Sequence, residues 1–326
     1  MKLFFITNSL SDLANPDAKI LKSVKNSLLL STGVEEVFSP DYANAIIIQE
    51  KNSFKNFRYI SELLEDPLVS KYPDKIFTIN TDDCATGLLK GIYTCLPGSR
   101  FNAEVYRSVP YMEFPNEFVF ANYSHYPEPI YLASWRGNTK SNKIRSKMIQ
   151  LFQDNDRLCL ESTDSWLNHN SHEKEDYVNL IRKSRFSLCP AGWAPASFRI
   201  YESMALGKCP VIIADQFVSP KGPNWKEFAL FFPEKKIHKL SAFLLEHEHQ
   251  ADDLGKKALA AWEKHFSVEH ISQYYADSLI SLICSTPKVS KKKELEKWTS
   301  LKLQWSNKWT LPQRALNKIK KIKNSF

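Results

Sequence analysis

Residues 185–215 read RFSLCPAGWAPASFRIYESMALGKCPVIIAD, and no other stretch of the 326-residue chain is as informative. The apolar run 186–189 predicts a strand, which the Pro- and Gly-containing segment 190–196 ends. Ser197 is a favourable N-cap for a helix that Gly207 stops, and the β-branched run after this glycine is typical of a buried parallel strand. A loop that leaves a strand and enters a helix exposes backbone N–H groups at the carboxyl edge of a sheet, where α/β proteins bind phosphorylated ligands.

The charge of Arg199 sharpens this prediction. Arg199 falls in the first turn of the expected helix, where the helix dipole disfavours a cation by about 0.3–1 kcal/mol. Glu202 and Ser203 follow three and four residues later, so the three side chains share one helix face. One interpretation is an anion bound by Arg199 and the helix N-terminus, with Glu202 accepting hydrogen bonds from a sugar hydroxyl, because a guanidinium grips a diphosphate through two parallel bonds. The alternative is an ordinary surface Arg–Glu pair.

The same segment resembles the exostosin-type glycosyltransferases. The resemblance rests on the Phe-x-Leu-x-Pro strand end, the small-residue loop, Ser-Phe-Arg-x-x-Glu at 197–202 and the Cys-Pro-Val-Ile that follows. Upstream, Tyr-Leu-Ala-Ser-Trp-Arg-Gly at 131–137 is similar to the strand–Gly–helix entry of that family. The resemblance covers about residues 128–235. It implies an α/β, GT-B architecture: two Rossmann-like, doubly wound lobes that face a cleft, with the nucleotide-sugar in the C-terminal lobe.

Length and composition agree with two folded domains. A chain of 326 residues exceeds one comfortable core, and 43% hydrophobic residues exclude a disordered protein. No apolar run approaches the roughly 20 residues of a spanning helix, and the run at 3–6 is too short for a signal peptide. Six cysteines are scattered without a Cys-x-x-Cys, and several of them lie in apolar runs, which indicates buried thiols in a reducing cytosol. Eukaryotic exostosin-like enzymes are usually membrane-anchored. Because the sequence predicts no such anchor here, we expect a bacterial-like, cytoplasmic member.

The net charge of +8 is concentrated at the C-terminus. Residues 287–326 contain 12 Lys and Arg against 2 Glu, whereas the first 286 residues contain 32 basic and 34 acidic side chains. The nearly neutral body argues against nucleic acid as a partner. The tail combines tryptophans and an apolar helical series with lysines, which is typical of a segment on an anionic membrane surface. The alternative, known from GT-B chains, is a helix that packs back on the first lobe. We expect residues 290–309 to pack and residues 311–326 to meet the membrane.

Strand-like and helix-like segments alternate in two series along the chain. This order predicts two parallel, doubly wound sheets. Between the series, residues 97–128 are rich in Pro, Asn and Tyr without a clear period and indicate a passage between domains. We therefore predict an N-terminal acceptor-binding lobe at 1–127, a C-terminal nucleotide-sugar-binding lobe at 128–286, and a basic amphipathic C-terminal tail at 287–326.

The donor site is predicted at two strand–helix turns of the second lobe. Arg136 and Gly137 follow a strand directly, and a polar loop then leads to a helix that carries Arg145. For Arg145 the alternative is a solvated helix face shared with neighbouring lysines. The predicted donor-binding residues are Arg136, Gly137, Arg145, Gly192, Ser197, Phe198, Arg199 and Glu202.

An inverting transfer also needs a base that takes the proton of the acceptor hydroxyl. Asp82 and Asp83 follow a strand of the first lobe, and two adjacent carboxylates raise one another's pKa. We predict one of them as the catalytic base. The alternative is an aspartate pair that only shapes a turn.

The Asp-Asn-Asp at 154–156 matches the pattern by which GT-A transferases hold a divalent metal. It lies before a strand and not after one, so we interpret it as a surface turn and expect that no metal or other cofactor is required.

These observations predict a glycosyltransferase. It would move a sugar from a nucleotide-diphosphate-sugar donor to a glycan acceptor, by inversion and without a metal. We expect a lipid-linked acceptor in bacterial surface polysaccharide (lipopolysaccharide or capsule) biosynthesis, at the inner face of the cytoplasmic membrane. The alternatives are a GT-A-like, metal-dependent transferase that uses Asp154 and Asp156, and a non-catalytic nucleotide- or glycan-binding partner of a membrane assembly complex.

Overall fold

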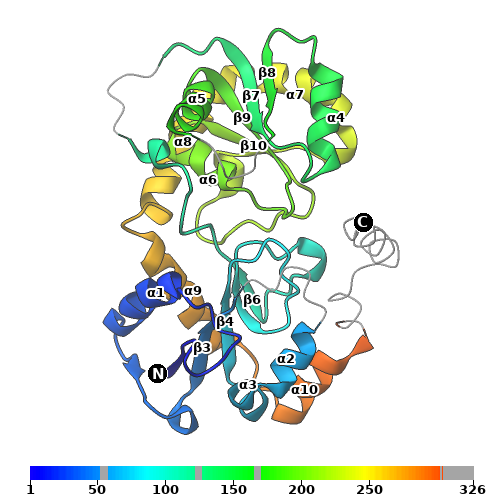
Figure 1. The fold of residues 1–326 in the computed structure, drawn as a ribbon. Helices are drawn as coiled ribbons and strands as arrows, with labels where there is room; N and C mark the ends of the chain where they lie inside the picture. The colour runs from blue at the N-terminus through cyan, green and yellow to red at the C-terminus, as the bar shows by residue number, and fades with distance from the viewer. Residues whose placement is uncertain (52–57, 122–126, 165–169, 302, 304–326) are drawn as a thin grey trace. The chain divides into compact units, whose positions relative to one another are not determined.

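The computed structural model describes residues 1–51, 58–121, 127–164, 170–301 and 303. The chain divides into two compact units (Figure 1). Unit 1 contains residues 1–96, 100–107 and 276–326, and unit 2 contains residues 97–99 and 108–275. Each unit is built on one sheet with helices on both faces, which confirms the predicted α/β class with two doubly wound lobes. The cleft that the GT-B resemblance implies stays a prediction.

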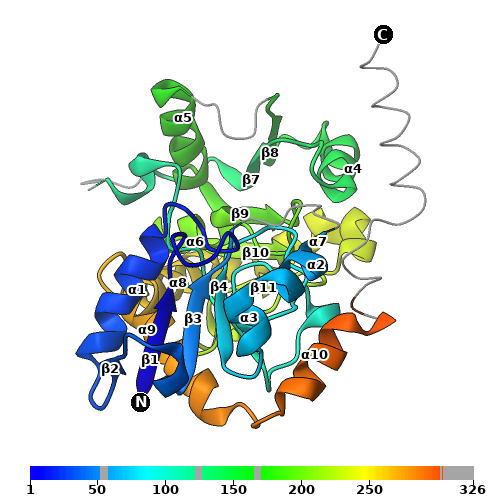
Figure 2. The same ribbon diagram turned by 60° about the horizontal axis from the view of Figure 1, so that its bottom comes forward.

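Unit 1 contains a six-stranded sheet in the order β2-β1-β3-β4-β5-β6. The pairs of β1 with β2 and β3, of β3 with β4 and of β4 with β5 are parallel. Every residue of β3 and β4 is buried, as expected for apolar strands covered on both faces. Helix α1 lies on one side of the sheet and α2 and α3 on the other (Figure 2). The bounds are β1 Lys2–Ile6, β2 Glu35–Glu36, β3 Ala45–Gln49, β4 Ile76–Asn80, β5 Lys90–Tyr93, β6 Tyr106–Ser108, α1 Lys19–Leu30, α2 Tyr59–Glu65 and α3 Pro67–Lys71.

Unit 2 contains a five-stranded sheet in the order β11-β10-β9-β7-β8, in which all neighbouring pairs are parallel. Helices α4 and α7 lie on one side of it and α5, α6 and α8 on the other (Figure 1). Its core is formed by buried apolar side chains of the strands together with those of α4, α7 and α8. The bounds are β7 Tyr131–Gly137, β8 Leu158–Ser162, β9 Ser184–Pro190, β10 Cys209–Ile213, β11 Leu230–Phe231, α4 Lys143–Phe152, α5 Ser171–Arg182, α6 Phe198–Ala205, α7 Leu240–His247 and α8 Ala251–His265.

In both sheets the chain reverses its direction of winding beside the first strand of the unit. From β1 the chain adds β2 on one side and then β3 on the other, and from β7 it adds β8 on one side and then β9 on the other. The loops after these strand pairs diverge, and the gap between them at the carboxyl edge is where open α/β sheets bind ligands. The topology therefore marks one candidate site in each unit.

The unit boundaries differ from the predicted ones at 127 and 286. Residues 108–121 belong to unit 2, where Val119 packs in an apolar cluster with Val178 and Leu206. Helix α9 (Ile271–Ser285) begins in unit 2 and ends in unit 1. The sequence of residues 97–128 did not reveal this packing, because its apolar side chains follow neither a helical nor a strand period.

The first part of the tail packs on unit 1. Helix α10 (Lys291–Thr299) lies beside α2, and its Trp298 has no exposed surface and joins the core of unit 1 (Figure 2). Glu294 of the same helix is also buried and pairs with Lys297 at 3.4 Å. The membrane prediction concerns residues 311–326, which lie outside the described residues. Within the described residues, no helix combines the length and the apolar character that crossing a membrane requires.

Candidate functional site

The carboxyl edge of the unit 2 sheet carries a cavity of about 150 Å³ between the end of β7 and the start of α6, the helix that follows β9. The position is the switch point that the topology marks. Seven of the eight predicted donor-binding residues line the cavity, and Gly192 does not. The lining residues are Pro115, Asn116, Arg136, Gly137, Asn138, Arg145, Thr163, Glu173, Lys174, Tyr177, Ser197, Phe198, Arg199 and Glu202.

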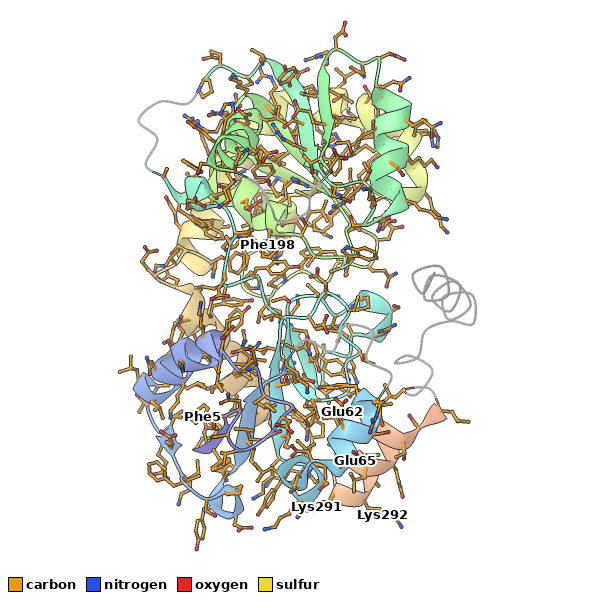
Figure 3. All side chains as sticks on the ribbon, viewed as in Figure 1. Phe5, Glu62, Glu65, Phe198, Lys291 and Lys292 are labelled. Carbon is orange, nitrogen blue, oxygen red and sulfur yellow. The ribbon has the colours of Figure 1, made fainter. Side chains whose placement is uncertain are left out.

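The N-terminus of α6 forms as the sequence predicts. The Ser197 hydroxyl oxygen accepts the backbone N–H of Arg199 at 3.4 Å, which caps the helix. Gly207 ends the helical segment with a φ of +64°, a left-handed conformation that glycine adopts without strain. Phe198, labelled in Figure 3, lies over Tyr111 with ring centroids 4.0 Å apart and so forms part of the cavity wall. Local sequence is therefore sufficient to place the loop and the helix start.

Arg199 is a buried cation at the cavity. The residue is 8% exposed, and its guanidinium lies over the rings of Trp135 and Tyr177, at 5.5 and 5.2 Å from their centroids. Its Nη2 donates to the backbone carbonyl of Arg136, whereas its buried Nε has no hydrogen-bond partner. Within the described residues no carboxylate oxygen forms an ion pair with it. The buried Nε is therefore a donor that an anion in the cavity could engage, and Glu202 is the buried carboxyl whose pKa the charge of Arg199 lowers.

Glu202, one turn after Arg199, is 4% exposed and accepts a hydrogen bond on Oε2 from the Tyr177 hydroxyl. Burial raises the pKa of Glu202, while the Tyr177 hydrogen bond and the charge of Arg199 act in the opposite direction. Since both Arg199 and Glu202 are buried, the alternative of an ordinary surface ion pair is wrong. Ser203, the third residue of the predicted helix face, does not line the cavity. Its hydroxyl donates to the backbone carbonyl of Arg199 and lies 2.7 Å from the Ser187 hydroxyl of the sheet.

Arg136 lies at the cavity with its guanidinium already paired. Its Nη1 lies 3.3 Å from a carboxylate oxygen of Glu161 and 3.8 Å from one of Asp176. Its backbone carbonyl accepts the hydrogen bond from Arg199. The predicted contact between Arg136 and a diphosphate stays a prediction, and such a contact would compete with two carboxylates.

Arg145 joins the two loops that flank the cavity. The residue is buried, and its guanidinium donates to the carbonyls of Asn138 at 3.1 Å, Pro190 at 3.3 Å and Ala191 at 2.9 Å. The alternative of a solvated helix face is therefore wrong for this residue. Gly192 lies beside it, and a Cβ there would approach Arg145 Nη2 to 2.8 Å. The two residues hold the loop after β7 against the loop after β9, whereas direct contact with a donor stays a prediction for both.

Sequence analysis missed Tyr177 as a site residue. Its position in an amphipathic segment predicts an inward, apolar role, and the ring does pack with Val178 and Ile181. The hydroxyl, however, reaches Glu202 from a different helix. No local signal predicts this pairing, because it joins residues 25 positions apart in the sequence.

The predicted catalytic pair lies in unit 1, after β4. Asp82 is buried, and its Oδ1 accepts the backbone N–H of Cys84 at 2.9 Å, so this side chain shapes the turn in the way that the alternative expects. Asp83 is partly buried, and its Oδ1 accepts the thiol of Cys95 at 3.5 Å. The catalytic role of either residue stays a prediction.

A further carboxyl, Glu50, lies at the same edge of the unit 1 sheet and was not predicted. It follows β3 directly and is 3% exposed. Its Oε2 accepts hydrogen bonds from the Thr78 hydroxyl at 2.5 Å and the Asn80 amide at 2.9 Å. Burial raises the pKa of Glu50 from 4.5 to about 7, and the charge of Asp82 adds to the rise. The signal in the sequence is a glutamate directly after a fully buried strand, Ala45–Gln49, whose first four residues are apolar.

The switch point of unit 1 carries a second cavity, of about 480 Å³. The loop after β1 and the junction between α2 and α3 enclose it, and Glu62 and Glu65 of α2 line it (Figure 3). Asp66 fixes one wall, because its carboxylate accepts the Ser11 hydroxyl and two backbone N–H groups of α3. The lining is polar, which suits a ligand rich in hydroxyl groups.

No group of three or more His, Cys, Asp or Glu side chains among the described residues is arranged to hold a metal ion. Asp154 and Asp156 precede β8 and so lie at the amino edge of the sheet, opposite the edge that carries the cavity.

The fold and the cavity define unit 2 as a doubly wound α/β domain of the class that binds its ligand at the switch point. Residues 98–247, which make up most of this unit, match the family model described as the Exostosin GT47 domain. Over these residues the match confirms the predicted resemblance to the exostosin-like glycosyltransferases.

Similar proteins share the same part of the chain. A probable glucuronoxylan glucuronosyltransferase of Arabidopsis thaliana, IRX7, is 45% identical over 73 residues, which are 22% of this chain and 16% of that protein. A second probable glucuronoxylan glucuronosyltransferase of the same plant is 35% identical over 113 residues, 34% of this chain and 22% of that protein. The chain thus spans less than a quarter of the length of these relatives. The crystal structure of TarM matches 66% of this chain and 57% of its own at 9% identity and a TM-score of 0.37.

Proposed function

We propose that the protein is a glycosyltransferase that moves a sugar from a nucleoside-diphosphate-sugar to a glycan acceptor. The observation that carries the proposal is Arg199, a buried guanidinium at the carboxyl edge of a doubly wound sheet, whose Nε has no hydrogen-bond partner. The match of residues 98–247 to the Exostosin GT47 domain supports the same reaction class.

The cavity of unit 2 supplies the groups that a nucleoside diphosphate requires. Arg199 Nε and the N-terminal N–H groups of α6 would bind the diphosphate, and the Ser197 hydroxyl lies at the same helix start. Glu202 would accept hydrogen bonds from the ribose. In the transfer, the bond between the anomeric carbon and the diphosphate oxygen breaks, and Arg199 stabilises the charge that develops on the leaving diphosphate.

Unit 1 would hold the acceptor and take its proton. The acceptor oxygen forms the new bond to the anomeric carbon, with inversion, and its proton passes to a carboxylate. Asp82 and Asp83 are the predicted candidates, and the raised pKa of Glu50 makes it a third. The polar cavity at the unit 1 switch point is the place we propose for the sugar hydroxyls of the acceptor.

The finer proposal concerns substrate and location. The names of the relatives make glucuronosyl donors the first to test. We propose a lipid-linked acceptor in bacterial surface polysaccharide synthesis, on the cytoplasmic face of the membrane. Residues 287–326 contain 12 basic and 2 acidic side chains, which supports a location at the membrane. Each basic residue near an anionic surface contributes about 1 kcal/mol to membrane binding.

A thermal-shift panel of nucleoside diphosphates and nucleotide-sugars tests the proposed function. A ligand at about 100 times its Kd stabilises the fold by about 2.7 kcal/mol. The best donor is then incubated with and without EDTA and followed for release of the nucleoside diphosphate. Binding without release or transfer from any donor would favour a non-catalytic binding module, and loss of turnover in EDTA would contradict the metal-independent mechanism.

The membrane proposal has its own test. Full-length protein should co-sediment with anionic vesicles at low salt and be released at high salt, whereas a chain truncated after residue 310 should not sediment. Release of the nucleoside diphosphate should survive this truncation. Vesicle binding that is indifferent to both salt and truncation would contradict the proposal.

A further inference from the structure

Tyr177 connects the two groups on which the proposed donor site depends. Its hydroxyl donates to Glu202, and the face of its ring lies 5.2 Å from the Arg199 guanidinium. It comes from α5, whereas both partners come from α6. Tyr177 therefore contacts Glu202 through its hydroxyl and Arg199 through the face of its ring.

The hydrogen bond restricts Glu202 in two ways. It engages Oε2, so that Oε1 is the oxygen left for a second donor. It also lowers the pKa of Glu202, against the effect of burial, and so favours the ionised carboxylate. An ionised acceptor held in one orientation forms stronger and more selective hydrogen bonds to hydroxyl groups than a mobile, protonated one.

We propose that Tyr177 is a positioning residue that holds Glu202 for the ribose hydroxyls and so makes the site select ribonucleoside over deoxyribonucleoside diphosphates. The inference rests on the proposed function, because it presupposes that the cavity takes a nucleoside diphosphate. It adds a residue and a selectivity that the match to the Exostosin GT47 domain does not provide.

The variant Tyr177→Phe isolates the hydroxyl. Phenylalanine keeps the ring against Arg199 and the packing on Val178, and it removes only the donor to Glu202. Tyr177→Leu removes the ring as well. The matched control is Tyr274→Phe in the same unit, whose hydroxyl donates to the Lys221 carbonyl and whose residue is absent from the cavity lining.

The experiment is calorimetry on full-length protein with UDP and GDP and with their 2′-deoxy and 3′-deoxy forms. In the unmodified protein and in Tyr274→Phe, one deoxy form should bind about 10-fold or more weakly than its parent, the loss expected for one hydrogen bond to a charged group. In Tyr177→Phe this ratio should fall to about 2 or less, with the affinity for that deoxy form unchanged. Tyr177→Leu should also weaken the deoxy form.

A pH series separates positioning from simple packing. As the pH falls, the selectivity for the ribose hydroxyl that remains in Tyr177→Phe should be lost at a higher pH than in the unmodified protein, because Glu202 loses a hydrogen bond that favours its ionised form. Besides Tyr177, the described charged or titratable groups around Glu202 are Arg199 on α6, Cys189 on β9, and Arg136, Arg145, Glu173 and Lys174 of the cavity lining, and none of these is changed in the variant.

Two results overturn the inference. One is a parent-to-deoxy ratio that Tyr177→Phe leaves unchanged, and the other is an unmodified protein that binds parent and both deoxy forms equally. If neither UDP nor GDP binds at all, the proposed function itself fails, and the inference fails with it.

Discussion

The two units bury different ionisable groups at the same point of the same topology, a guanidinium in unit 2 and a carboxyl in unit 1. At the carboxyl edge beside β9, unit 2 buries a guanidinium, Arg199, and leaves its Nε without a partner. At the carboxyl edge beside β3, unit 1 buries a carboxyl, Glu50, between two hydrogen-bond donors. The doubly wound sheet thus selects the location of a site, and the side chains brought there select its chemistry. A cation suits a leaving diphosphate, and a carboxyl of raised pKa suits proton transfer.

The largest effect should come from the carboxyl side of this comparison. Among Glu50→Gln, Asp82→Asn and Asp83→Asn, the variant that lacks the true base should lose about 10²–10⁴-fold in turnover and keep its affinity for the nucleoside diphosphate. Turnover with the best donor of the panel and calorimetry with its nucleoside diphosphate measure the two quantities. Near-normal turnover in all three variants would place the base elsewhere in the chain.

The pH dependence of stability should separate the two units next. Glu50 keeps its proton up to pH 7 in the folded state and only to pH 4.5 when unfolded, so the stability that its protonated form provides is fully present below pH 4.5 and is lost as the pH rises to about 7. A difference of this size corresponds to about 3 kcal/mol. Denaturant unfolding of unmodified protein and Glu50→Gln, from pH 4 to 8, should show this loss only in the former.

The control for that series is Glu65→Gln, which changes an exposed carboxyl on α2 of the same unit. Its stability should follow the unmodified protein at every pH. If Glu50→Gln did the same, Glu50 would not be the carboxyl that holds its proton near neutral pH.

On the cationic side, Arg199→Ala should weaken binding of the nucleoside diphosphate by about 1.5–3 kcal/mol, the value of a charge-assisted hydrogen bond. Thermal stability should be preserved, because the charge opposes its own helix dipole and lacks an ion pair among the described residues. Arg199→Lys is the control that keeps the charge without the planar fork. If calorimetry shows the same affinity for the nucleoside diphosphate in Arg199→Ala, Arg199 does not bind the diphosphate.

The smallest effect should come from the contact between the two loops of unit 2. In Gly192→Ala the new Cβ meets Arg145 Nη2 at 2.8 Å, so the guanidinium must move and its bond to the Pro190 carbonyl weakens. We expect a cost of about 0.5–1.5 kcal/mol in nucleoside diphosphate affinity, the range of one ordinary hydrogen bond. Affinity equal to that of the unmodified protein would show that Arg145 adjusts without disturbing the loops.

Much of the donor cavity could be predicted because its signals are local. The capping serine, the terminal glycine and the spacing of Arg199 and Glu202 lie within 11 residues, and helix geometry alone places them. The role of Arg136 could not be predicted in the same way. Its two carboxylate partners come from β8 and α5, and only the folded sheet brings these elements to the end of β7.

Near neighbours in the chain were enough to predict the two alternating series of strands and helices and the helix start that carries Arg199, since periodicity and capping act over a few residues. Only the packing of the folded units decided which ionisable side chains have hydrogen-bond partners. It buried Glu50 beside Thr78 and Asn80, engaged Arg145 with backbone carbonyls, and left the Nε of Arg199 unpaired. The physical reason is that burial and pairing depend on distances between residues far apart in sequence, and those distances exist only after the sheets have formed.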